Sequence, residues 1–118
     1  MNVLLVFLGG GIGCALRYGV GLVAASTVFP YATFAVNAIG SFAIGLFGGW
    51  ASRFGWSEEM RLLLTTGLCG GFTTFSTFSK ESFALAEAGR WSAFATYAVG
   101  SVSVGIVAVA FGYWFAKN

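Results

Sequence analysis

The chain has 118 residues, of which 58% are hydrophobic and only 8% are charged. A soluble domain carries roughly 25% charged residues, and the six basic and four acidic side chains present here cannot cover a water-soluble core. The net charge of +2 comes from so few residues that it marks no nucleic-acid surface. The composition therefore excludes a soluble domain and a nucleic-acid partner, and it predicts a protein embedded in the lipid bilayer.

Four apolar segments are long enough to cross a membrane, because a hydrocarbon core of roughly 30 Å requires about 20 helical residues. In chain order they cover residues 3–27, 32–52, 58–87 and 91–116. Pro30 separates the first two, since proline disfavours helix in the residue before it, and Ser57 is expected to cap the third. The sequence thus predicts one all-α transmembrane domain over residues 1–118, with four helices and both termini on one side.

The third segment is longer than one span requires. As a continuous helix, residues 58–87 would reach roughly 45 Å, with their midpoint beside Phe72. Residues 70–77, Gly-Gly-Phe-Thr-Thr-Phe-Ser-Thr, combine glycines with hydroxyl residues that weaken a helix. We expect a broken helix at mid-membrane depth, where interruptions commonly mark ion or substrate sites. The alternative is a continuous helix whose hydroxyls bond to preceding carbonyls.

Small residues recur at helical spacing in the first two segments. Gly9 and Gly13, and likewise Gly45 and Gly49, are four positions apart. This small-xxx-small spacing lets membrane helices approach closely. We therefore assign these glycines to helix packing and not to chemistry.

Basic residues are nearly balanced between the two ends of the predicted bundle. Arg53, Arg61 and Lys117 lie toward the side of the termini, and Arg90 lies opposite. The Lys and Arg bias orients a membrane protein, so a small bias predicts insertion in both orientations. Two oppositely oriented copies then form an antiparallel two-fold homodimer, which is a closed assembly. The alternative is a single orientation fixed by these few charges.

The chemistry-bearing residues are too few for catalysis. The sequence has no histidine, its two cysteines are isolated, and no acid lies in the first, second or fourth segment. Catalytic triads, zinc sites and two-carboxylate mechanisms therefore lack their parts, and we expect no enzyme. Asn37, in the second segment, offers two N–H donors to an anion, and an interhelical hydrogen bond is the alternative role.

Aromatic and hydroxyl residues follow the predicted break. Phe75 and Phe78 are three apart and share a helix face, with Ser76 and Thr77 between them. Because a phenyl ring has a positive edge, these rings can line an anion path. Thirteen phenylalanines occur in the chain, so packing is the alternative for each of them.

The fourth segment carries a thin polar stripe. Tyr97 and Ser101 are four positions apart on one face, and Gly105 continues it. Gly105 leaves the backbone accessible on this face because it has no side chain. The alternative is that each hydroxyl bonds back to its own helix.

Charged side chains within the apolar segments require a reason. Arg17 lies in the first segment. Inserting an arginine at the centre of a transmembrane helix costs roughly 2.5–3.5 kcal/mol of free energy. We favour a water-filled vestibule that draws anions in, and snorkelling to the interface is the alternative. Lys80 and Glu81 either form a similar mouth or belong to a solvated helix end.

Residues 70–78, Gly-Gly-Phe-Thr-Thr-Phe-Ser-Thr-Phe, resemble the signature of the Fluc/CrcB fluoride channels. Residues 13–18, Gly-Cys-Ala-Leu-Arg-Tyr, resemble the GxxxRY stretch of their first helix. The resemblance covers the whole chain. It implies a fluoride-selective passive channel in the cell (inner) membrane that exports cytoplasmic fluoride and reduces its toxicity. It further implies an antiparallel dual-topology homodimer with a central structural Na⁺.

The resemblance also implies roles for individual residues. The sodium-binding backbone carbonyls fall on Gly70 and Thr73. The fluoride path falls on Asn37, Phe75, Phe78, Tyr97 and Ser101, with Ser76 and Thr77 beside the rings. Beyond Ser101 the fourth helix has Gly105 and Val109, where a further hydroxyl is expected.

Two other classes of membrane protein share part of this pattern. A small multidrug-resistance-type cation exporter has the same length, four helices and dual topology, but it needs a membrane-embedded carboxylate, usually in the first helix. Here the first segment holds Arg17 and no acid. A structural subunit packed by glycines gives no reason for the predicted break.

Overall fold

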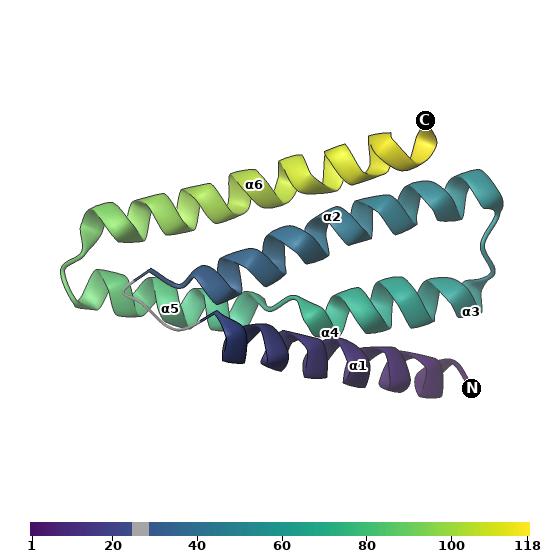
Figure 1. Ribbon diagram of the computed structural model, residues 1–118, viewed down its shortest axis with the longest axis horizontal. Helices are drawn as coiled ribbons and strands as arrows, with labels where there is room; N and C mark the ends of the chain where they lie inside the picture. Colours follow the sequence, from purple (N-terminus) through teal and green to yellow (C-terminus); the bar gives the residue numbers. More distant parts are fainter. Residues whose placement is uncertain (25–28) are drawn as a thin grey trace.

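The computed structural model describes residues 1–24 and 29–118, and every element within these ranges is helical. In chain order the elements are α1 (Asn2–Val23), α2 (Tyr31–Phe54), α3 (Glu58–Arg61), the π-helix η1 (Leu62–Cys69), α4 (Gly70–Phe72), α5 (Phe75–Glu87) and α6 (Trp91–Lys117). The helices run side by side along the long axis, and both termini lie at the same end (Figure 1). The shared side of the termini is thus confirmed, whereas the expected end of the first span at Thr27 lies outside the described residues.

Within the described residues, α1, α2 and α6 are each long and apolar enough to cross a membrane. The expected third span is not one of them. It consists of the run from Glu58 to Phe72 followed by α5, which has 13 residues, and each part is shorter than the about 20 residues that a span requires. The all-helical membrane fold is therefore established, with three continuous spanning candidates.

Local sequence signals account for most helix ends. Gly55 ends α2 in the left-handed conformation (φ 62°), which glycine adopts without a steric penalty. The Ser57 hydroxyl accepts a hydrogen bond of 3.2 Å from the Met60 amide at the start of α3, as predicted. Gly89, with φ 75°, makes the turn between α5 and α6. The expected ends of the second and fourth segments agree with α2 and α6 to within two residues.

The run of helix that begins at Glu58 has two irregular parts. Leu62–Cys69 is a π-helix, which the sequence did not predict. It changes the side of the helix on which the following side chains lie. Thr73 (φ −89°, ψ 160°) and Thr74 (φ −152°, ψ 115°) are extended and separate α4 from α5. These two threonines set the position of every residue in α5 relative to α2 and α6.

Glycines bring helix backbones into contact. A Cβ atom at Gly9 would overlap the Leu63 carbonyl oxygen, and one at Gly13 would overlap that of Leu68. A Cβ at Gly45 of α2 would likewise overlap the main chain of α6. The predicted packing role of the small-xxx-small pairs is therefore confirmed, for α1 against η1 and for α2 against α6.

The close approach of α1 to η1 makes a prediction about stability. In Gly13→Ala, the added methyl group meets main-chain atoms that cannot rotate away, so α1 has to shift. We expect the free energy of unfolding to fall by about 1–3 kcal/mol, measured as a lower thermal midpoint of the detergent-purified protein. Gly11→Ala is the matched control, because among the described residues no atom beyond the neighbouring backbone of α1 itself lies within 4 Å of a Cβ there. Equal midpoints for the two variants would contradict the packing assignment.

Candidate functional site

The amide side chain of Asn37 pairs with the main chain of the extended residue Thr74. Asn37 Nδ2 donates to the Thr74 carbonyl oxygen at 3.1 Å, and the Thr74 amide donates to Asn37 Oδ1 at 2.8 Å. Both polar groups of the Thr74 backbone are therefore satisfied by α2. This is the interhelical bond that the sequence left as the alternative role of Asn37. Because Nδ2 carries two protons, one N–H remains for a further acceptor.

Thr74 is also the cap of α5. Its Oγ1 accepts from the Thr77 amide at 3.2 Å and donates to Thr77 Oγ1 at 3.0 Å. Ser76 Oγ lies 3.4 Å from the same oxygen, but Ser76 is exposed. A residue next to Phe75 is rotated about 100° around the helix axis, so Ser76 does not share the face of Phe75 and Phe78.

The interruption leaves two main-chain carbonyls without a helical donor. In an α-helix, the amide of residue i+4 bonds to the carbonyl of residue i. The Thr74 amide bonds to Asn37 instead of the Gly70 carbonyl. Thr73 is extended and precedes the cap of α5, so its carbonyl belongs to neither helix. The carbonyl oxygens of Gly70 and Thr73 thus have no helical donor at the interruption.

Backbone oxygens of this kind fit a hard cation, which prefers oxygen ligands. Within residues 1–24 and 29–118, no group of three or more His, Cys, Asp or Glu side chains is placed to hold a metal ion. Gly70 and Thr73 are the two positions that the sequence resemblance assigned to sodium.

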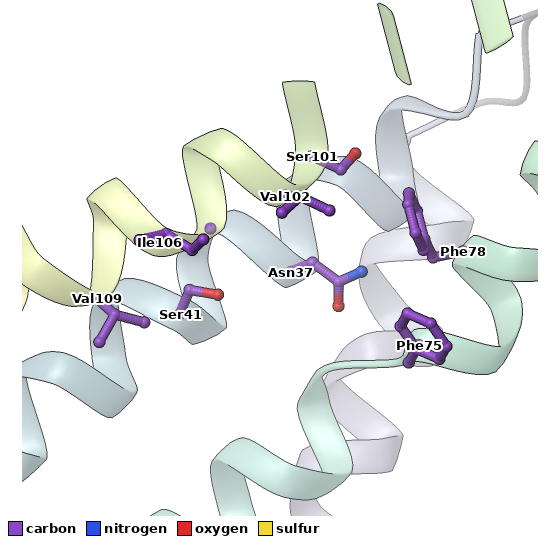
Figure 2. Close-up of a pocket in the computed structure, with 9 residues that line it drawn as sticks. Asn37, Ser41, Phe75, Phe78, Ser101, Val102, Ile106 and Val109 are labelled. Atoms are coloured by element: carbon purple, nitrogen blue, oxygen red, sulfur yellow. The ribbon is translucent and has the colours of Figure 1, made fainter. Parts of the chain in front are cut away.

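A cavity of about 320 Å³ lies between α2, α5 and α6, and we call it the central cavity. It brings together four of the predicted site residues, namely Asn37, Phe75, Phe78 and Ser101. Figure 2 shows the Asn37 amide and the two rings converging on this space. The ring centroids of Phe75 and Phe78 are 5.8 Å apart, and Phe75 is 77% exposed. The central cavity is therefore open on the side of Phe75 in a single chain.

A further cavity of about 220 Å³, the Arg17 cavity, is lined by residues of α1, of α2 and of the start of α5. Arg17, Thr74, Thr77 and Glu81 are its polar lining residues, together with Thr33 and Tyr18. Arg17 Nε donates to the Gly71 carbonyl oxygen at 3.1 Å. The guanidinium group is thus anchored to the main chain beside the interruption, and its vestibule role stays a prediction.

Tyr97 connects the two cavities without lining either of them. Its side chain is fully buried, its ring centroid lies 5.1 Å from that of Phe78, and its hydroxyl donates to Glu81 Oε1 at 2.9 Å. The sequence analysis did not pair Tyr97 with Glu81. The available signal was that a carboxylate and a phenol in an apolar bundle each need a polar partner.

Comparison with known proteins shows extensive similarity. Residues 4–113 match the family model described as CrcB-like protein, Camphor Resistance (CrcB). The chain is 48% identical to the fluoride-specific ion channel FluC of Phocaeicola vulgatus, over 98% of both proteins. It is 53% identical to the protein of the same name from Methylobacterium nodulans, over 92% of this chain and 90% of the relative. The similarity covers all of the helices described above.

The pairing of Asn37 with Thr74 makes a prediction about stability. Asn37→Ala leaves the Thr74 amide and carbonyl without their partners in an apolar environment. We expect the free energy of unfolding to fall by about 1–3 kcal/mol, measured as the thermal midpoint of the purified protein in detergent. Ser52→Ala, an exposed position on the same helix, should keep the wild-type midpoint. A wild-type midpoint for Asn37→Ala would show that the interruption does not depend on this pairing.

Proposed function

Because this chain belongs to the CrcB-like protein family, we propose that it is a fluoride-selective ion channel through which cytoplasmic fluoride leaves the cell passively. The observation that carries this proposal is sequence identity: about half of all positions, over nearly the full length, are identical to those of proteins named fluoride-specific ion channels. The function is then transport and not catalysis. The chain is a multi-pass membrane protein, and the cell (inner) membrane is its proposed location.

The physical logic of such a channel requires only a passive pore. Fluoride enters cells as uncharged HF, dissociates in a more neutral cytosol and is trapped there as the anion. An exit path for the anion therefore lowers its toxicity without an energy source. Fluoride is small and strongly hydrated, so the path has to replace water with closely placed donors.

The central cavity supplies groups of this kind. The remaining N–H of Asn37, the positive ring edges of Phe75 and Phe78 and the Ser101 hydroxyl border one space. None of these groups carries a negative charge that would repel the anion. We propose that fluoride passes between the Arg17 cavity and the central cavity, past Thr77, Phe78 and Tyr97.

The open side of the central cavity supports an antiparallel homodimer. Phe75 is 77% exposed in a single chain, so a second copy on this side would close the central cavity and keep lipid out of an ion path. The nearly balanced basic residues permit both orientations, and a two-fold axis closes the assembly. We propose four membrane crossings per chain, with the third crossing made by two half-helices that meet at mid-membrane depth.

A structural Na⁺ on the dimer axis completes this proposal. The carbonyl oxygens of Gly70 and Thr73 have no helical donor, and two copies would present four such oxygens to one hard cation. The ion would hold the two interruptions together. It takes no part in the fluoride path itself.

The main alternative is a proton-coupled cation exporter, which needs a free carboxylate in the membrane. The Glu81 carboxylate accepts a hydrogen bond from Tyr97 and lies on the half-helix α5, not in the first span. This arrangement supports an anion path over a cation carrier. The functional test therefore includes a cationic substrate.

Efflux from liposomes tests the proposed channel directly. We expect the wild-type protein to release fluoride, followed with a fluoride electrode, and to release neither chloride nor a cationic dye. Phe75→Ile and Phe78→Ile keep the site apolar but remove the ring quadrupole. We expect each to lower fluoride flux at least about tenfold, since about 1.4 kcal/mol at the barrier is a factor of ten.

The matched control for these variants is Phe83→Ile, an exposed phenylalanine of the same helix α5. It should retain wild-type flux, and all three variants should elute at the wild-type position on size exclusion. Chloride or dye release by the wild type would refute the selective channel. Wild-type flux in Phe75→Ile and Phe78→Ile would refute only the proposed path.

A structure determined in sodium tests the assembly and the ion together. We expect two chains in opposite orientations, with one ion on the two-fold axis and the carbonyl oxygens of Gly70 and Thr73 from both chains around it. Sodium distances of roughly 2.4 Å are expected for oxygen ligands of a hard cation. A parallel pair, an axis without an ion or coordination by carboxylates would each overturn this part of the proposal.

A further inference from the structure

Ser41 is a cavity-lining residue to which the proposed path assigns no role. It lies one helical turn after Asn37 on α2 and borders the central cavity. Figure 2 shows its hydroxyl directed into that space. Within the described residues 1–24 and 29–118, no hydrogen bond involves this hydroxyl. Ser41 therefore presents an unused donor to the cavity.

The opposite wall of the cavity has no side chain at this level. Gly105 of α6 faces Ser41, and a Cβ atom built at Gly105 would lie 3.6 Å from Ser41 Oγ. This is an ordinary contact distance, so the space beside Gly105 is open and the Ser41 hydroxyl borders it. One turn earlier on α6, Ser101 Oγ is buried and has no hydrogen-bond partner in the described part of the chain. Two unpaired hydroxyls, one from each helix, thus follow one another along the cavity.

The remaining residues at this end of the cavity are apolar. Val102, Ile106 and Val109 complete the lining beyond Ser101. An anion that has left the Asn37 amide and the phenylalanine rings would therefore meet Ser41 as the donor at this level. Without that donor, a strongly hydrated ion would lose its water with no replacement.

We propose that the Ser41 hydroxyl donates a hydrogen bond to fluoride in this part of the cavity and continues the polar path from α6 onto α2. This inference rests on the proposed channel function. It makes Ser41 a determinant of fluoride permeation. Its hydroxyl on α2 replaces, from the facing wall of the cavity, the hydroxyl that α6 lacks at Gly105. The hydroxyl acts by its location, so the same group supplied from the facing helix should serve equally well.

Moving the hydroxyl across the cavity tests this inference. In liposome efflux with a fluoride electrode, we expect Ser41→Ala to lower fluoride flux about tenfold, the scale of a hydrogen bond to a charged group. Ser41→Cys keeps the shape of the side chain but offers a weak donor, and it should lower flux as well. Ser41→Ala combined with Gly105→Ser returns a hydroxyl to the same space and should restore most of the flux.

Ser103→Ala is the matched control, because Ser103 is an exposed serine of α6 outside the cavity lining, and it should retain wild-type flux. Wild-type flux in folded Ser41→Ala would overturn the inference while leaving the channel function intact. A double variant that remains folded but as slow as Ser41→Ala would also overturn it, because the hydroxyl would then not act by location. Failure of the wild type to pass fluoride would instead refute the proposed function.

Discussion

A bilayer offers no water to a main-chain amide or carbonyl, so an extended residue inside a membrane protein needs partners from the protein itself. The side-chain amide of Asn37 meets this requirement for Thr74, because it bonds both the amide and the carbonyl of that residue. The amide of an asparagine has the same donor and acceptor groups as a peptide unit. It therefore replaces, at one position, the helical neighbours that Thr74 gave up.

The rest of the site follows from this pairing. Holding Thr74 against α2 starts α5 at Phe75 and directs Phe75 and Phe78 toward the cavity that α2 and α6 border. It also keeps the Thr74 amide from the Gly70 carbonyl, which leaves an oxygen available for other ligands. Tight glycine contacts between α2 and α6 make this pair of helices a firm support. The position of α5 is then defined relative to a rigid surface.

Sequence reasoning recovered the elements but not the contacts between them. Pro30 and Ser57 act on residues close to them in the chain, so the sequence could locate the helix ends beside them. The facing of Phe75 and Phe78 likewise followed from their spacing. No sequence signal pointed to the π-helix η1. The two hydrogen bonds between Asn37 and Thr74 and the hydrogen bond from Tyr97 to Glu81 join residues from distant parts of the chain. Spacing along one helix carries no information about such pairs, which explains why the role of Asn37 was left open.

The interruption at Thr73 and Thr74 also gives the site a fixed electrical polarity. The C-terminal end of one helical run, at Phe72, carries a partial negative charge, and the N-terminal end of α5, at Phe75, carries a partial positive charge. These charges arise from aligned peptide dipoles, which do not titrate. One break in the chain therefore creates adjoining regions that favour a cation and an anion, and the Arg17 guanidinium already bonds to the Gly71 carbonyl in the first of them. The signs of these two partial charges stay the same at any pH at which the helices remain folded.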